Sequence, residues 1–318
     1  MLSWKAPRFW YRSPALLLKI ILKPIAKIYS FISTRNYKKE YKYRSSKAKV
    51  IAVGGITVGG SGKTMVVRSI CKILKAQNKK VAILSRGYGR SGKDTLLVDG
   101  KIHSYQNVGD EPFLLSSEVP VYVGEDRFES AMLAEASGYE FLILDDGITQ
   151  KFLKPDIKLV VVDNEQRFGN GEMLPLGPNR LNFEKIKEDI DGIIILGRGK
   201  KRNFINAYDI PVFYGEIHQD FSKIKKKKII VFCGIGYPDK FFDSFVNFET
   251  IEKIAFSDHY PFSSDDMEKL ILKANNCHAQ LVTTEKDFVR IPAKYRSAII
   301  AVSAQIFWED SIDTIISF

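Results

Sequence analysis

The sequence of 318 residues predicts an α/β fold in which a doubly wound parallel sheet is followed by a second, smaller α/β domain. Two observations predict it. Short runs rich in Val, Ile and Leu alternate with helix-compatible stretches, and these runs are apolar throughout, as expected for strands buried on both faces of a parallel sheet. The pattern then lapses between residues 203 and 228, where charged residues cluster, and a second group of apolar runs follows.

The first group predicts strands at residues 50–53, 81–84, 119–123, 141–144, 158–162 and 192–196, with helices at 65–75 and 127–137. The second group comprises apolar runs at residues 229–232, 241–248, 280–283 and 298–302, with a helix at 264–274. This order favours a parallel sheet in the first domain and a smaller α/β unit after it.

The segment from Thr57 to Thr64 predicts a phosphate-binding loop, because it joins the first expected strand to the first expected helix. Its glycines let consecutive backbone N–H groups converge on phosphate oxygens, and the helix dipole favours the same anion. Lys63 is expected to reach the β- and γ-phosphates, and Thr64 to ligate Mg²⁺. Thr57 stands where the strict pattern has glycine, so the loop is a variant, and a plain glycine-rich turn is the alternative. The nucleotide-binding residues are Thr57, Val58, Gly59, Gly60, Ser61, Gly62, Lys63 and Thr64.

Two adjacent carboxylates, Asp145 and Asp146, follow the apolar run at residues 141–144. A P-loop enzyme holds its Mg²⁺ with a carboxylate at a strand end, directly or through water. A solvated turn would show the same residues. In one sheet with the loop at Lys63, however, Thr64, Asp145 and Asp146 are the expected metal site, and the sheet is expected to be of the P-loop NTPase type.

Two further residues are candidates for proton transfer. Asp110 lies in Gly-Asp-Glu-Pro, expected as a loop between strand-like segments, and a carboxylate there could receive or orient the proton of a substrate hydroxyl. His259 lies in a polar, aromatic turn before a helix, where a solvated histidine is the alternative. Arginines at expected strand ends could hold phosphates bidentately, with surface solvation as the alternative. They are Arg86, Arg90, Arg127 and Arg180.

The N-terminus predicts a helix at a membrane interface. Residues 4–32 are rich in Leu, Ile and aromatic side chains, yet six cations interrupt them and would fall within roughly 100° of a single helical wheel. Lysines through the middle are costly in a spanning helix, and Pro24 is expected to kink the segment. A helix packed on its own domain is the alternative. The cations are Lys5, Arg8, Arg12, Lys19, Lys23 and Lys27.

The net charge of +11 points to an anionic partner, which could be acidic lipid, a phosphorylated substrate or nucleic acid. The basic tract at residues 35–49 would lie beside anionic headgroups. We therefore expect residues 1–34 to form an amphipathic membrane-association helix, residues 35–215 the P-loop domain, and residues 216–318 the smaller C-terminal α/β domain. The three cysteines share no metal-ligand spacing, which favours a reducing compartment.

Eight ordered motifs together resemble the tetraacyldisaccharide 4'-kinase family of lipid A biosynthesis, and they extend over nearly the whole chain. The motifs begin at Thr57 and Leu84 (Leu-Ser-Arg-Gly-Tyr-Gly-Arg), Gly109, Asp145, Asn170 (Asn-Gly-Glu-Met-Leu-Pro-Leu-Gly-Pro), Phe232 (Phe-Cys-Gly-Ile-Gly), Asp258 and Thr283 (Thr-Thr-Glu-Lys-Asp).

The resemblance implies a membrane-associated P-loop kinase at the cytoplasmic face of the bacterial inner membrane. It implies that ATP and Mg²⁺ are used to phosphorylate the 4'-hydroxyl of an acylated disaccharide 1-phosphate. Asp110 is then the general base and His259 its partner in a dyad, while Lys63 joins them in catalysis. Ile148-Thr149-Gln150 stands where the family has Phe-Gln-His, so no role of those side chains is carried over.

Other classes of function are less well supported by the sequence. No Asn-Lys-x-Asp segment for reading guanine follows a late strand, and no basic, aromatic-lined groove for nucleic acid is indicated. We expect neither nucleic acid nor an obligate protein as a partner. A membrane-associated P-loop ATPase without a lipid acceptor remains the alternative to a kinase.

Overall fold

The computed structural model describes residues 7–39, 43–197 and 209–316. The chain divides into two compact units, which are described separately. Of the described residues, those within 7–217 and 306–316 form the larger unit, and residues 218–305 form the smaller one. We expected residues 306–318 in the smaller unit. They return to the larger one because Trp308 Nε1 donates to Ser69 Oγ at 2.8 Å and Ile312 is buried there.

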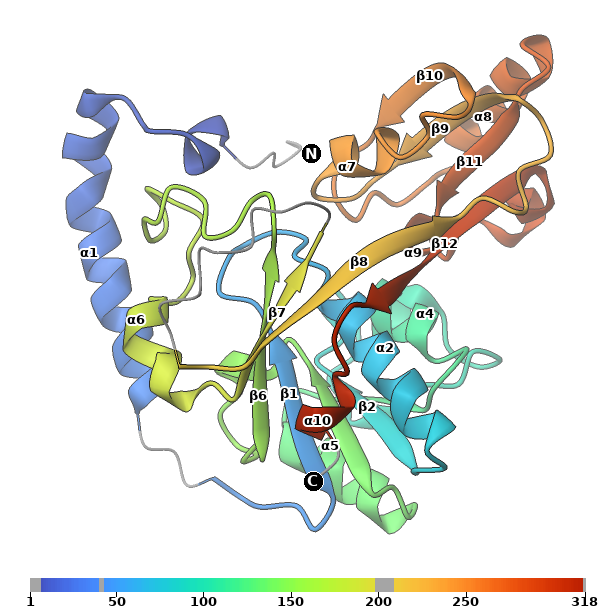
Figure 1. Cartoon of the computed structure of the whole chain (residues 1–318). Helices are drawn as coiled ribbons and strands as arrows, with labels where there is room; N and C mark the ends of the chain where they lie inside the picture. Colours follow the sequence, from blue (N-terminus) through green and yellow to red (C-terminus); the bar gives the residue numbers. More distant parts are fainter. Residues whose placement is uncertain (1–6, 40–42, 198–208, 317–318) are drawn as a thin grey trace. The chain divides into compact units, whose positions relative to one another are not determined.

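The larger unit contains a sheet in the order β8-β7-β6-β1-β5-β2-β4-β3. Its neighbouring strands pair parallel from β8 to β4, and the edge strand β3 pairs antiparallel with β4. Strand order runs outward in both directions from β1, which is the doubly wound arrangement that the sequence predicts (Figure 1). All six expected strands are confirmed. The strands are β1 (Lys49–Gly54), β2 (Val81–Ser85), β3 (Leu96–Leu97), β4 (Val121–Val123), β5 (Phe141–Asp145), β6 (Ile157–Asp163), β7 (Gly192–Leu196) and β8 (Val212–Asp220).

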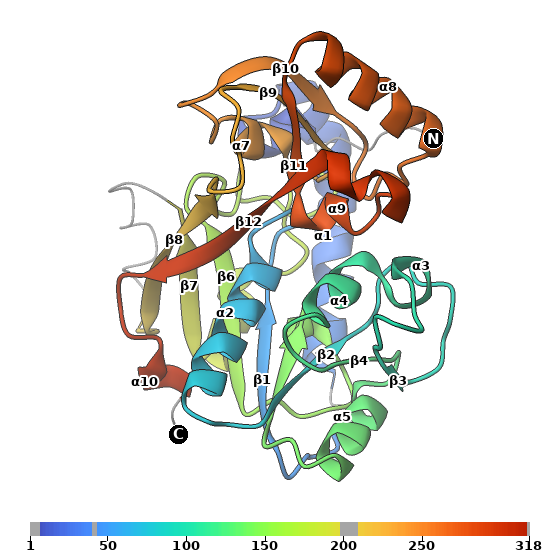
Figure 2. The ribbon, with the colours of Figure 1, turned by 90° about the vertical axis from the view of Figure 1, so that its right-hand side faces the viewer.

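Helices cover both faces of this sheet (Figure 2). On β1, Ile51 and Val53 pack in one core with α2 (Lys63–Ala76), whereas Val50 and Ala52 pack in another with α5 (Arg127–Ala136). This alternation follows from the two-residue period of a strand. The other helical segments of the unit are α3 (Tyr105–Val108), α4 (Asp110–Leu115), α6 (Phe183–Ile186), α10 (Asp313–Ile316), η2 (Gly147–Thr149) and η3 (Lys187–Asp189).

The N-terminal segment differs from the expected single helix. A short 3₁₀ helix, η1 (Arg8–Tyr11), is followed by α1 (Leu16–Lys38), which continues through Pro24. Pro14 explains the break, because the residue before a proline is disfavoured in the helical region. Of the six cations, only Lys19, Lys23 and Lys27 lie on α1; Arg8 and Arg12 precede it, and Lys5 lies outside the described residues. In the described part of the chain, no helix is both long and apolar enough to cross a membrane.

Helix α1 buries little of its apolar surface. Ala26 packs with Met173 and Leu176, and Thr34 is also buried. Most of its large apolar side chains are exposed, with relative exposures of 50–74%. They are Leu16, Leu17, Ile20, Ile21, Ile25, Ile28, Phe31 and Ile32.

The smaller unit is a parallel sheet in the order β10-β9-β11-β12, with α8 (Ser264–Asn276) over one face and α7 (Pro238–Phe242) over the other. The expected helix at residues 264–274 is confirmed. Its strands are β9 (Lys228–Cys233), β10 (Glu249–Ala255), β11 (Gln280–Thr284) and β12 (Ile299–Trp308, which continues into the larger unit), and its other helices are α9 (Glu285–Phe288) and η4 (Ala293–Ala298).

The apolar run at residues 241–248 is not a strand. Pro238 stands at the start of α7, and the aromatic side chains of the run pack on the sheet from this helix and the turn after it. The strand beside β9 is instead β10, in which intermediate and exposed residues alternate. An edge strand of this composition lacks the continuous apolar run by which we recognised the others.

Candidate active site

The phosphate-binding loop lies at the carboxyl end of β1, at the edge where parallel α/β sheets bind their ligands. Gly62, the residue before α2, has φ +86°, and a Cβ there would lie 2.6 Å from Leu196 Cδ1. A larger residue would therefore be strained in backbone conformation and would clash with the end of β7. The opposite side of the loop is open, because a Cβ on Gly60 would meet nothing within 4 Å.

A buried hydroxyl in this loop could donate a hydrogen bond to a phosphate. Ser61 is only 5% exposed, and its Oγ is buried without a hydrogen-bond partner. Such an orphaned donor normally requires an explanation, and phosphate oxygens beside the loop would accept its hydrogen bond. The loop is also tied to residues 178–179, because Val58 N–H donates to Pro178 O at 2.8 Å and Thr57 bridges to Asn179.

Asp146 binds two cationic side chains at the same edge. Arg180 donates to both of its carboxylate oxygens, at 3.0 and 2.9 Å, and Lys63 Nζ lies 3.9 Å from Oδ1. Burial would raise the pKa of Asp146, but the hydrogen bonds from Arg180 and the charges of Lys63 and Arg180 lower it overall. Asp146 has φ +52°, an uncommon value for a non-glycine residue that these contacts stabilise. The pairing with Arg180 is long-range in sequence, and it is neither of the two roles expected for this arginine, phosphate binding or surface solvation.

Asp145 lies in a different environment at the end of β5. Asp145 is 6% exposed. Its burial, together with the charges of Glu111 and Asp146, raises its pKa to about 7, although the charges of Lys63 and Arg127 lower it. A bound cation would favour the ionised carboxylate. Glu111 belongs to the Gly-Asp-Glu-Pro motif, and we had not assigned it a role.

These residues fit a magnesium ion with few protein ligands. No group of three or more His, Cys, Asp or Glu suited to a metal is present among the described residues. Mg²⁺ bound with nucleotide takes one or two carboxylates and fills its shell with phosphate oxygens and water. The Asp145 carboxylate and the Thr64 hydroxyl have the required oxygen chemistry, whereas Asp146 is already paired with Arg180.

Asp110 is the first residue of α4 rather than part of a loop. It is 6% exposed, and its Oδ1 accepts the N–H of Glu111 at 2.9 Å. Gly109, with φ +95°, lets the backbone approach the segment that begins at Leu84, because a Cβ there would lie 3.1 Å from Tyr88 O. Two separate motifs thus meet, and Glu111 of one of them acts electrostatically on Asp145.

The four arginines have different surroundings. Arg127 is only 8% exposed, which excludes simple solvation for this residue. The guanidinium of Arg90 donates to Lys93 O at 2.7 Å and to Asp94 O at 2.8 Å. These bonds stabilise the turn at residues 90–94. Arg86 is exposed. Arg180 binds Asp146.

His259 lies in the smaller unit, in the turn before α8. It has φ +57°, and its N–H donates to Gly234 O at 3.1 Å. Its Nε2 lies 3.3 Å from Lys286 Nζ. Because Asp110 belongs to the larger unit, the pairing of the two residues stays a prediction.

The residues that replace Phe-Gln-His have structural contacts. Ile148 is 4% exposed and packs in the core next to Gly54, where a Cβ would lie 2.5 Å from Ile148 Cγ1. Gln150 Oε1 accepts the N–H groups of Phe152 and Leu153, at 3.1 and 3.0 Å. The segment therefore closes a turn behind the site.

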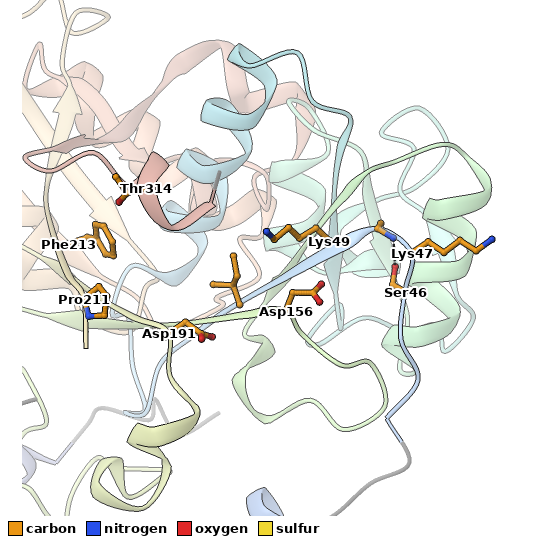
Figure 3. Close-up of a pocket in the computed structure, with 10 residues that line it drawn as sticks. Ser46, Lys47, Lys49, Asp156, Asp191, Pro211, Phe213 and Thr314 are labelled. Carbon is orange, nitrogen blue, oxygen red and sulfur yellow. Dashed lines mark hydrogen bonds between the residues drawn. The ribbon is translucent and has the colours of Figure 1, made fainter. Parts of the chain in front are cut away.

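A cavity of about 760 Å³ lies at the opposite edge of the sheet (Figure 3). Lys49 and Ile157 begin β1 and β6, so the cavity is at the amino ends of these strands. Asp156 Oδ2 accepts the N–H of Val50 at 2.8 Å, and Asp191 Oδ2 that of Lys158 at 2.7 Å. The two carboxylates that line the cavity thus stabilise the strand ends, and we do not assign the cavity to the active site.

Comparison with known proteins shows the family to which the chain belongs. A family model described as tetraacyldisaccharide-1-P 4'-kinase matches residues 18–317. Similar proteins include the tetraacyldisaccharide 4'-kinases of Paramagnetospirillum magneticum and Hyphomonas neptunium, each 34% identical over 96% of this chain and 95% of theirs. The crystal structure of LpxK from Aquifex aeolicus in complex with ATP aligns with a TM-score of 0.72 and 25% identity, covering 94% of this chain and 97% of that chain. The chain therefore belongs to the tetraacyldisaccharide-1-phosphate 4'-kinase family.

Proposed function

We propose that this chain transfers the γ-phosphoryl group of ATP to the 4'-hydroxyl of a tetraacyldisaccharide 1-phosphate, a precursor of lipid A. The observation that carries the proposal is the meeting of Lys63, Asp145 and Asp146 at the edge of the sheet that holds the phosphate-binding loop. Family membership supports the acceptor and the nucleotide.

The residues of the larger unit have separable roles in this reaction. The loop at residues 57–64 holds the phosphates through its backbone N–H groups and Ser61 Oγ, and Lys63 places positive charge beside the transferred group. Thr64 and Asp145 would hold Mg²⁺, which neutralises charge on the phosphates when bound. Asp146 orients Lys63, because its Oδ1 lies 3.9 Å from the ammonium.

Asp110 is the proposed general base. It would accept the proton of the sugar hydroxyl while that oxygen attacks the γ-phosphorus. Its burial at the start of α4, and the charge that the next residue, Glu111, exerts on Asp145, support this role. His259 is its proposed partner from the smaller unit.

One assay tests the proposal directly. The protein is incubated with γ-labelled ATP, Mg²⁺ and an acylated disaccharide 1-phosphate in detergent micelles, and label is followed into the lipid and into free phosphate. Label in the lipid supports the kinase. Release of phosphate alone would favour a membrane-associated ATPase.

Removing the charge of Asp146 should raise the Mg²⁺ requirement. In Asp146→Asn, Lys63 and Arg180 lose their carboxylate partner, and the nearby charge that attracts the cation disappears. We expect the half-saturating Mg²⁺ concentration to rise about 10-fold, within the range for residues that surround a metal site. Titration of transfer against Mg²⁺ measures it. Asp265→Asn, at a side chain of α8 that is 73% exposed, is the control. An unchanged titration in Asp146→Asn would remove this carboxylate from the site.

We place the enzyme at the cytoplasmic face of the bacterial inner membrane. The exposed apolar side chains of α1 and the lysines at 19, 23 and 27 support attachment to a lipid surface with anionic headgroups. A deletion of residues 1–32 is a poor test, because it would also remove buried Trp10, whose Nε1 donates to Pro175 O at 2.9 Å.

Polar substitutions on α1 should release the protein from vesicles. The triple variant carries Leu17→Gln, Ile21→Gln and Ile28→Gln. We expect each change to weaken partition of the protein from water onto the membrane by roughly 1 kcal/mol, about half the value for fully burying an apolar side chain. The expected loss of partition onto anionic vesicles is about 100-fold. Co-sedimentation with vesicles measures it. The matched control replaces exposed Leu97, Leu133 and Leu272 elsewhere, and equal binding by both triple variants would exclude α1 as the main anchor.

A further inference from the structure

The motif from Thr283 to Asp287 lies at the end of β11 and in α9 (Figure 1), and the function proposed above gives it no role. The side chains of Asp287 and Arg290 are 0% and 2% exposed and form an ion pair. Asp287 Oδ1 accepts the N–H of Gly234 at 2.9 Å, and Arg290 donates to Gly234 O at 2.9 Å. The buried pair therefore binds both backbone polar groups of one residue.

Gly234 in turn fixes the backbone of His259. The N–H of His259 donates to the same Gly234 oxygen, at 3.1 Å. A Cβ on Gly234 would lie 2.8 Å from Ser257 O, so the two segments approach as closely as glycine allows. A positive φ at His259 costs free energy and persists only where the surroundings determine it. These contacts supply that constraint.

Lys286, next to Asp287, contacts the imidazole ring itself. Its Nζ lies 3.3 Å from His259 Nε2. An ammonium group can only donate hydrogen bonds, so Nε2 must accept, and a neutral ring then carries its proton on Nδ1. Asp258 also lies near the ring: its Oδ1 is 3.9 Å from Nε2, beyond hydrogen-bond distance, and accepts the backbone N–H of His259 at 3.1 Å.

We propose that Lys286 is a positioning residue that binds Nε2 of His259 and thereby holds the proton of the ring on Nδ1. The inference rests on the proposed role of His259 as the partner of Asp110. A ring with its proton on Nδ1 donates from that atom to a carboxylate, which is the bond that a histidine needs to orient a general base. The buried Asp287–Arg290 pair fixes the backbone from which the ring projects.

Nitrogen NMR of the full-length protein tests the inference without turnover. The chain has four histidines, so the ring signals of His259 are identified by their loss in His259→Gln. Spectra are recorded at about pH 8.5, roughly two units above the ordinary histidine pKa. We expect Nδ1 of His259 in the protonated range and Nε2 in the unprotonated range. A wild-type ring protonated on Nε2 overturns the inference.

Substitution of the lysine gives the second readout. Lys286→Met keeps most of the aliphatic stem but removes the donor, so we expect the ring to move toward protonation on Nε2. Lys269→Met, whose side chain in the wild type is 73% exposed, is the matched control and should keep the wild-type spectrum. Retention of the Nδ1–H form in Lys286→Met overturns the inference. Backbone amide spectra establish that each variant is folded.

Kinetics separate this inference from the proposed function. Lys286→Met should lower kcat about 10-fold with KM for ATP unchanged, since proton-transfer geometry is altered and nucleotide binding is not. If the proton moves to Nε2 while kcat stays at the wild-type value, the positioning by Lys286 stands and the catalytic role of His259 fails. If His259→Ala loses turnover but the wild-type ring is protonated on Nε2, the positioning fails and the catalytic role stands.

Discussion

Replacing Lys63 with alanine is expected to lower kcat for phosphoryl transfer by at least about 100-fold, the effect of removing one preorganised donor to developing charge. Lys63 is the first residue of α2, and its ammonium lies 3.9 Å from Asp146 Oδ1 at the edge of the sheet that holds the loop. No other residue of the loop carries positive charge. The measurement is transfer of labelled phosphate to the lipid acceptor at saturating ATP and Mg²⁺.

Helix α2 offers a matched control for this substitution. Lys72→Ala removes a lysine from the same helix, eight residues beyond the end of the loop. Its side chain is 51% exposed, and its Nζ lies 3.8 Å from Glu118 Oε2. Its turnover should stay near the wild-type value. Near-wild-type turnover in Lys63→Ala would instead reject the assignment of the loop to phosphate binding.

The core of the larger unit could be predicted from sequence because its signals are local. Each strand buried on both faces is a nearly continuous apolar run, and α2 and α5 begin directly after Gly62 and Asp126. The loop from Thr57 to Thr64 was recognised for the same reason, since its function depends on the order of adjacent residues. Its exception to the strict pattern, Thr57, bridges to Asn179.

Features that depend on distant contacts could not be predicted. Strand β10 is an edge strand in which exposed and intermediate residues alternate, and four of its seven residues are polar, so its apolar content is too low to distinguish it from a loop. The bond between Asp146 and Arg180 joins residues 34 positions apart, and no pattern in either segment indicates it. The return of residues 306–318 to the larger unit likewise depends on tertiary contacts such as that between Trp308 and Ser69.

The loop at residues 170–180 forms hydrogen bonds with two segments of the larger unit that are far apart in the sequence. Asn170 Nδ2 donates to Phe9 O and Leu176 O, each at 3.0 Å, so the loop holds the segment before α1. At its other end, Pro178 O accepts from Val58 of the phosphate-binding loop. Residues 170–180 therefore hold two segments at once: the one before α1, which is expected at the membrane, and the phosphate-binding loop.

The second large effect concerns the proposed dyad. Asp110→Ala and His259→Ala are each expected to lower kcat by about 100-fold or more, at the lower end of the range for general acid–base groups. ATP affinity should stay largely intact, because neither side chain needs to contact the nucleotide in this mechanism. Single-turnover transfer at saturating substrates gives the rate, and calorimetric titration with a non-hydrolysable ATP analogue gives the affinity.

The double variant decides whether the two residues act together. If Asp110 accepts the proton only when His259 orients it, removal of either group abolishes the same step, and the double variant should be little slower than the slower single one. Fully multiplicative losses would show two independent contributions and reject the dyad. A selective loss of nucleotide affinity in Asp110→Ala would instead place this carboxylate at the metal site with Asp145. The residue after Asp110, Glu111, already acts electrostatically on Asp145.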